Sequence, residues 1–231
     1  MEYTIALALV DFLPVIFSAI GVLLIAQMIS RFDHTSGLVA YLSAILITLG
    51  GLSKAVWKLV IAATGTDLSG LDDMLFIFLG IGFTLLSWAL FNAQRVMAGK
   101  EIPKHVWLRP LAVIALFGIG AISARIFQPD TRYWVYILLT LTTFANLAVG
   151  ILLIKQSLAF NLKVTAGLFL FNLIVIFAMS GMARIPEQTI TLQWIEESIN
   201  VLGQAAFAIA AWQLNRKTAV ATTSQLEQQY A

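Results

Sequence analysis

The sequence predicts an all-α, polytopic membrane protein with seven transmembrane helices arranged as a parallel 3+1+3 internal repeat. Hydrophobic residues make up 60% of its 231 residues and charged residues only 11%, whereas about a quarter of an average soluble domain is charged. Seven segments are apolar and long enough to cross a bilayer. The third and seventh of these segments align with each other without a gap.

The predicted spans are separated by short loops rich in Gly, Pro, Asp and Ser. A transmembrane helix needs about 20 mostly apolar residues. The segments that meet this length are residues 5–29, 37–63, 71–96, 106–127, 134–154, 160–183 and 190–214. Asp11 interrupts the first apolar run, and no basic region precedes it, so we expect no cleavable signal peptide.

An internal repeat relates the first three spans to the last three. Residues 71–92 align with residues 195–216, so that two acids open each copy and a Trp lies near its far end. The fourth span is then a linker, and the triplets are related by an axis along the membrane normal. The predicted units are the first repeat (1–97), the linker helix (98–132), the second repeat (133–217) and a mobile polar tail (218–231).

The distribution of basic residues predicts the orientation. Of the 14 Lys and Arg residues, nine fall on the side of the C-terminus and three on the side of the N-terminus. The positive-inside rule therefore predicts an outer N-terminus and a cytoplasmic C-terminus. We expect a bilayer environment, in a bacterial inner membrane. The net charge of +2 is spread over the loops, so it indicates topology rather than a nucleic-acid partner.

Most of the charge predicted inside the membrane lies in the outer half. These residues are Asp11, Lys54, Lys58, Asp72, Asp73, Arg184, Glu196 and Glu197. A charge facing lipid is costly, so we expect these side chains to point inward and form pairs. The repeat suggests pairs between Lys54 or Lys58 and the acids that open the third span, and between Arg184 and the acids that open the seventh. In a polar cavity, Asp11 is the most plausible neutralising partner of Lys54. The pairs are either structural clamps or the walls of a polar cavity.

The seventh predicted span carries a polar stripe. Glu196, Asn200 and Gln204 recur every four residues and therefore share one helix face. The matching positions of the third span are Asp72, Phe76 and Gly80, so the two copies have diverged. Asn146 and Asn172 either join this stripe or form hydrogen bonds between helices. The candidate substrate-binding residues are Lys54, Trp57, Lys58, Asn200 and Gln204.

The sequence shows no pattern of catalytic or metal-ligating residues. It has no Cys, and its two His residues, His34 and His105, lie in separate predicted loops. It contains no Ser/His/Asp set and no HExxH motif. We therefore expect no enzymatic activity, no metal site and no cofactor.

The predicted architecture resembles that of SWEET-type sugar transporters, PQ-loop proteins and PnuC-type vitamin transporters. SWEET-type sites use Asn and Trp near the midplane, which would favour Asn200 and Trp57 here. The Pro-Gln signature of PQ-loop proteins is absent, because Val15 follows Pro14. Microbial rhodopsins share the helix count, but a retinal Schiff base needs a Lys inside the seventh helix, and Lys217 lies beyond its end.

The resemblance implies a transporter or facilitator for a small polar solute. Its cavity would lie between the two repeats and open to the outer side. The alternative is a membrane sensor or a non-catalytic membrane subunit of a larger complex, with partner chains or further copies of this chain bound to it. A channel would require an oligomer, because one chain shows no ring of like charges and no filter sequence.

Overall fold

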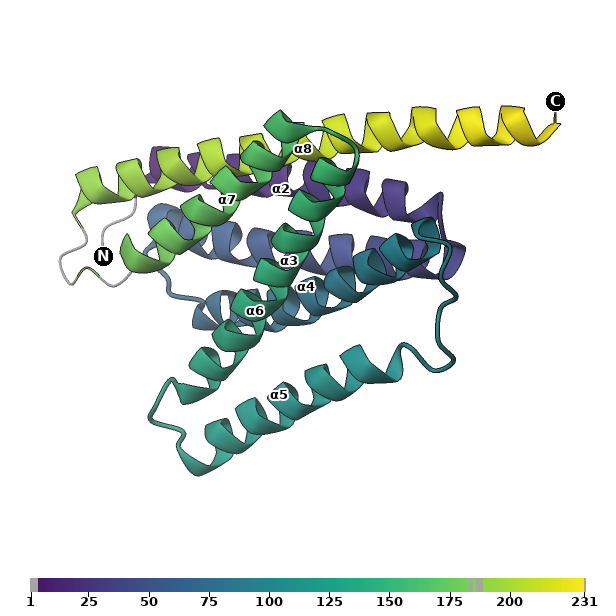
Figure 1. Cartoon of the computed structure of the whole chain (residues 1–231). Coiled ribbons are helices and arrows are strands. Elements are labelled where there is room, and N and C mark those ends of the chain that lie inside the picture. Colours follow the sequence, from purple (N-terminus) through teal and green to yellow (C-terminus); the bar gives the residue numbers. More distant parts are fainter. Residues whose placement is uncertain (1–3, 183–184, 186–188, 231) are drawn as a thin grey trace.

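The computed structural model describes residues 4–182, 185 and 189–230, and these residues form eight α-helices and no strand. The helices are α1 (Ile5–Val10), α2 (Phe12–Ser30), α3 (His34–Thr64), α4 (Ser69–Met97), α5 (Leu108–Phe127), α6 (Tyr133–Ala159), α7 (Lys163–Met182) and α8 (Ile190–Tyr230). Figure 1 shows their arrangement, and α1 is in contact with α8.

Six stretches of the described helices are long and apolar enough to cross a membrane: α1 with α2, and then α3, α4, α5, α6 and α7. They correspond to the first six predicted spans, and they indicate an integral membrane protein. The seventh span stays a prediction, because α8 is not among these stretches. Its sequence contains the adjacent acids Glu196 and Glu197 near the start and a polar second half.

The first predicted span is not one continuous helix. It breaks at Asp11, which separates α1 from α2. Pro14 explains the break, because proline has no N–H to donate to the carbonyl of Val10 and its ring crowds that carbonyl. Pro14 instead occupies the first turn of α2, where backbone N–H groups have no partner within the helix. Asp11 is therefore a one-residue junction between the two helices, and its backbone keeps helical angles (φ −60°, ψ −17°).

Two other boundaries differ from the prediction. α3 begins at His34, in the segment that we expected to be a loop, because the Asp33 carboxylate accepts a hydrogen bond from the Ser36 backbone N–H at 2.7 Å and caps the helix. α8 continues to Tyr230 through the residues that we expected to form a mobile tail. Figure 1 shows this part of α8 extending past the other helices.

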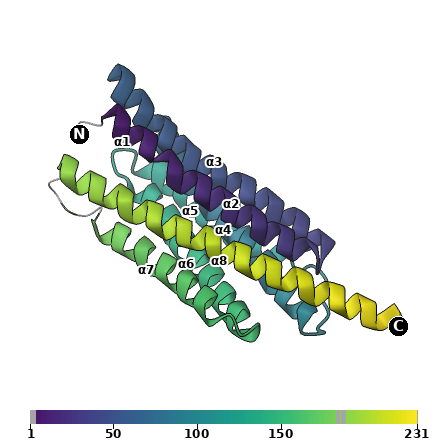
Figure 2. The same ribbon diagram turned by 90° about the horizontal axis from the view of Figure 1, so that it is seen from above.

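Six helices form a ring around the centre of the molecule. The neighbouring pairs in this ring are α2–α3, α3–α4, α4–α6, α6–α7, α7–α8 and α8–α2. α2 and α8 run side by side in both views (Figures 1 and 2). Small residues allow close contacts within the ring: a Cβ on Gly82 of α4 would lie 2.8 Å from Ile47 Cγ1 and 3.2 Å from the Ser43 carbonyl oxygen, both of α3.

α5 lies outside this ring and packs against α4 and α6 (Figure 1). An apolar groove of about 530 Å³ separates it from these two helices. Near the end of the groove, the Arg125 guanidinium lies 5.6 Å from the centroid of the Trp134 ring. The helix that the sequence predicts as a linker therefore takes no part in enclosing the centre of the ring.

The two ends of the ring are packed differently. We call them the Asp11 end, where α2, α4, α6 and α8 begin, and the Arg31 end, where α2, α4 and α6 finish. Towards the Arg31 end, the centre is filled by a continuous apolar core contributed by all the ring helices. Its fully buried members include Ile25, Leu90, Leu153 and Leu214. The space towards the Asp11 end is hollow.

Candidate functional site

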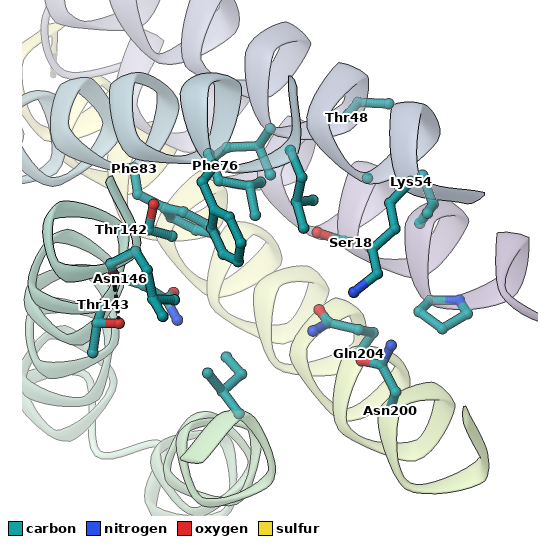
Figure 3. A pocket seen from close by; sticks show the side chains of 18 of the residues that line it. Ser18, Thr48, Lys54, Phe76, Phe83, Thr142, Thr143, Asn146, Asn200 and Gln204 are labelled. Carbon is teal, nitrogen blue, oxygen red and sulfur yellow. Dashed lines mark hydrogen bonds between the residues drawn. The ribbon is translucent and has the colours of Figure 1, made fainter. Parts of the chain in front are cut away.

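A cavity of about 290 Å³ occupies the Asp11 end of the ring (Figure 3). All six ring helices line it, and α5 does not. Its volume is at the small end of the range for ligand pockets, about 300–1,000 Å³. The polar residues that line it are Asp11, Ser18, Thr48, Lys54, Thr142, Thr143, Asn146, Ser180, Asn200 and Gln204.

One wall of the cavity combines a cation with two amides. Lys54 projects from α3, and its ammonium group points toward Asn200 and Gln204 on α8 (Figure 3). The four-residue spacing of the two amides on α8 places both on the cavity face. In the described part of the chain, the structure shows no ion pair or hydrogen bond for these three side chains. Their hydrogen-bonding groups are therefore available to water or a solute.

The opposite wall is formed mainly by α6. Thr142, Thr143 and Asn146 lie on its cavity face, and Phe76 of α4 lies between them and Lys54 (Figure 3). Each threonine hydroxyl donates to the backbone carbonyl four residues earlier, Leu138 at 2.9 Å and Leu139 at 2.8 Å. These hydroxyl oxygens can still accept a hydrogen bond. The cavity thus has two polar walls with an aromatic surface between them.

A buried group of three charges closes the ring beside the cavity. The Lys58 ammonium lies 3.0 Å from Asp11 Oδ2 and donates a hydrogen bond of 2.6 Å to Glu197 Oε1. The side chains of Lys58, Asp11 and Glu197 are only 11%, 10% and 7% exposed, respectively. They join the junction between α1 and α2, the last turns of α3 and the early turns of α8. We call them the Lys58 triad.

The two lysines of α3 therefore have different partners although they share one helix face. Lys58 lies one turn closer to the Asp11 end, and it forms ion pairs with both carboxylates of the Lys58 triad. Lys54 lies one turn deeper, about 15 Å from the end of α3, and faces the cavity. The pairing that we expected between either lysine and the acids opening α4 is wrong for Lys58, whose carboxylates come from α8 and from Asp11. The expected pairing of Asp11 with Lys54 is also wrong, because Asp11 pairs with Lys58.

The acids that open α4 have another partner. Arg132, at the start of α6, lies 3.3 Å from Asp72 Oδ2 and 3.9 Å from Asp73 Oδ1. Our prediction missed Arg132 because it considered partners only within each triplet. Arg132 precedes the first turn of the fifth predicted span, so the sequence already placed it at the same end of the bundle as Asp72. This position could have indicated the pair.

The remaining charged candidates are Arg184, which precedes the seventh predicted span, and the two acids near the start of that span. Arg184, the expected partner of Glu196 or Glu197, lies outside the described residues. Glu197 instead belongs to the Lys58 triad. Glu196, the residue before Glu197 on α8, is half-buried, and it does not line the cavity.

Trp57 and Asn172 differ from their expected roles in the site. The Trp57 indole donates a hydrogen bond of 2.8 Å to Asp67 Oδ1 in the loop after α3, and Trp57 does not line the cavity. Asn172 is buried and donates a hydrogen bond of 3.0 Å to the Gly203 carbonyl, so it joins α7 to α8. Asn146, the second amide that the sequence left open, does line the cavity.

The described residues contain no group of three or more His, Asp or Glu side chains arranged to hold a metal ion. No family model, no curated protein and no solved structure matches the chain.

Proposed function

We propose that the protein is a membrane transporter or facilitator for a small polar solute rather than an enzyme. One observation carries this proposal: a cavity enclosed by six helices has Lys54, Asn146, Asn200 and Gln204 on its walls, without an ion-pair or hydrogen-bond partner among the described residues. These four side chains are half-buried, so their hydrogen-bonding groups remain accessible from the cavity. Polar groups kept free around an intramembrane cavity are typical of a solute site.

The contact pattern of the ring supports the proposed 3+1+3 repeat. The sequence alignment exchanges α2 with α6, α3 with α7 and α4 with α8. This exchange converts every neighbouring pair of the ring into another pair of the same ring. The cavity would then lie on the axis between two related triplets, which is where parallel-repeat transporters place their site.

Two repeat-related glutamines add to this support. Gln27 of α2 and Gln156 of α6 occupy aligned positions, GVLLIAQ and GILLIKQ. Gln27 accepts a hydrogen bond from Asn215 of α8 at 3.0 Å, and Gln156 accepts one from Gln94 of α4 at 3.0 Å. Each glutamine therefore joins its own triplet to the last helix of the other triplet, at the Arg31 end.

The closed Arg31 end and the hollow Asp11 end suggest one state of an alternating-access cycle. With the N-terminus outside, as the basic residues predict, the Asp11 end would be the outer end and the cavity would open there. Rocking of one triplet against the other would break the glutamine contacts at the Arg31 end and expose the cavity to the cytoplasm, in a bacterial inner membrane.

The extension of α8 favours a second candidate function. This helix continues past the rest of the bundle to Tyr230 (Figure 1). A polar helix outside the bilayer offers a docking surface, which a membrane sensor or a non-catalytic subunit of a larger complex would use. In that case the Lys58 triad would act only as a structural clamp.

Thermal stability in mild detergent tests the proposal. The purified protein is heated with a panel of sugars, amino acids, organic acids, vitamins and nucleosides. A ligand at a hundredfold excess over its Kd stabilises the folded state by about 2.7 kcal/mol. We expect a saturable shift with one solute class, which Lys54→Met and Asn200→Ala remove.

The matched control is Ser198→Ala on α8. Ser198 is exposed and hydrogen-bonds to its own helix, so this variant should keep the shift. A panel without any shift, with other chains copurifying in fixed ratio, would contradict transport and favour the subunit.

A further inference from the structure

We propose that the solute bound in the cavity carries a carboxylate, which Lys54 binds together with the amides of Asn200 and Gln204. This proposal rests on the proposed transport function and specifies its substrate class. It follows from the different surroundings of two lysines. Lys58 pairs with Asp11 and Glu197 in the Lys58 triad, whereas Lys54 faces the cavity.

The ion pairs among the described residues do not include Lys54. Asp11 and Glu197 both lie within 3.0 Å of Lys58 Nζ, so the Lys58 triad pairs one ammonium with two carboxylates and has a formal charge of −1. Lys54, one turn away, has no acidic partner within ion-pair distance among the described residues. A cation inside a membrane protein requires an anionic or dipolar partner. The cavity provides the space for a partner that is not part of the chain.

The groups beside Lys54 in the cavity wall are amides that can donate hydrogen bonds. Asn200 and Gln204 can each turn an NH₂ group toward the position that Lys54 faces (Figure 3). An ammonium and two amides together offer several donors at one place. A carboxylate has about four acceptor sites and no donor, so it matches this set. Charge-assisted hydrogen bonds of this kind are about twice as strong as neutral ones.

The remaining cavity surface would contact the rest of the solute. Phe76 covers the middle of the cavity, and Asn146, Thr142 and Thr143 line the opposite wall. The threonine oxygens can accept, and Asn146 can both donate and accept. The geometry therefore fits a small carboxylic acid with a short apolar middle and a second hydrogen-bonding group, such as a hydroxyl, at its other end.

A charge-selective labelling experiment tests this proposal before the solute itself is identified. The chain has no Cys, so Asn200→Cys introduces a single thiol in the cavity. Its labelling rates are measured with an anionic sulfonatoethyl and a cationic trimethylammonium-ethyl methanethiosulfonate. Each rate is normalised to Gln128→Cys, an exposed site at the C-terminal end of α5. Gln204→Cys repeats the measurement one turn further along α8.

We expect the anionic reagent to react about tenfold or more faster in the cavity, because a charged cleft concentrates counter-ions. Adding Lys54→Met should remove this preference. Labelling without a charge preference would overturn the carboxylate proposal and leave the solute cavity intact. A thiol that neither reagent reaches at either position would overturn both proposals.

Competition with four solutes of similar size then separates a free anion from a zwitterion. Lactate, alanine, lactamide and alaninamide share a three-carbon skeleton and differ in charge. The competition uses Ser18→Cys, which also lines the cavity, because Asn200 and Gln204 are themselves proposed ligands of the carboxylate. We expect lactate or alanine to slow labelling of Ser18→Cys, and protection by alanine alone would identify an amino acid. Protection by lactamide equal to that by lactate, or protection by neither carboxylate, would overturn the proposal.

Discussion

The two contacts between the helix triplets differ at the Asp11 end. Between α2–α3 and α8, the Lys58 triad is buried, with side-chain exposures of 11%, 10% and 7%. Between α4 and α6, Arg132 is 64% exposed and its partner Asp72 is 24% exposed. The acid pairs that open α4 and α8 align in sequence, yet one acid is fixed in the interior and the other lies at the surface.

At the Arg31 end, the same two contacts resemble each other. Each joins an aligned glutamine to a polar side chain of the facing helix, Gln27 to Asn215 and Gln156 to Gln94. The difference between the ends shows where the copies have diverged. An exposed ion pair is worth about 0–1 kcal/mol, whereas breaking a buried pair by removing one partner costs about 3–5 kcal/mol. The α4–α6 contact should therefore separate more readily than the α2–α8 contact.

The largest expected effect comes from Lys58→Met. This substitution leaves Asp11 and Glu197 as two buried carboxylates without their cation, so we expect a loss of about 3–5 kcal/mol in the free energy of unfolding. Denaturation by SDS in mixed micelles measures it. The triple variant with Asp11→Asn and Glu197→Gln removes all three charges and should recover most of the loss. A single variant as stable as the wild type would show that the triad does not hold the two triplets together.

A smaller effect is expected from Asn215→Leu. Arg31 donates to Asn215 Oδ1 at 2.8 Å and to its backbone carbonyl at 3.0 Å, so the substitution removes the side-chain half of this contact as well as the bond to Gln27. An unsatisfied buried polar group costs about 1–3 kcal/mol. The same titration applied to Gln94→Leu provides the matched change at the other contact. If the two variants lose free energies of unfolding that differ by more than about 2 kcal/mol, the two glutamine contacts at the Arg31 end are not equivalent.

The smallest effect is expected from Arg132→Gln. The Arg132 side chain is mostly exposed, so its pairing with Asp72 and Asp73 contributes less than about 1 kcal/mol. Repeating the SDS titration at high salt should leave the difference between wild type and variant close to zero. A loss comparable to that of Lys58→Met would mean that the two triplet contacts are equivalent after all.

The sequence predicted the first six membrane spans because long apolar runs determine them. It also singled out Lys54, Asn200 and Gln204, whose role in binding stays a prediction, from their charge and helical spacing. It did not predict the triad, because the break at Asp11 and the packing of α8 against α2 and α3 decide which lysine meets which acid. Trp57 looked suitable from its distance to Lys54 along the helix, but its indole is bonded to Asp67 in the loop after α3, and it does not line the cavity.

Uptake of the protecting solute into proteoliposomes tests transport most directly. The initial rate is measured for the wild type and for Lys54→Met, after confirming that both unfold at the same temperature. We expect saturable uptake by the wild type and a rate lower by about 30-fold or more in the variant, because truncating one partner of a buried charge pair costs at least about 2 kcal/mol. Equal uptake by both proteins, or binding of the solute without uptake by either, would contradict a transporter whose site lies at Lys54.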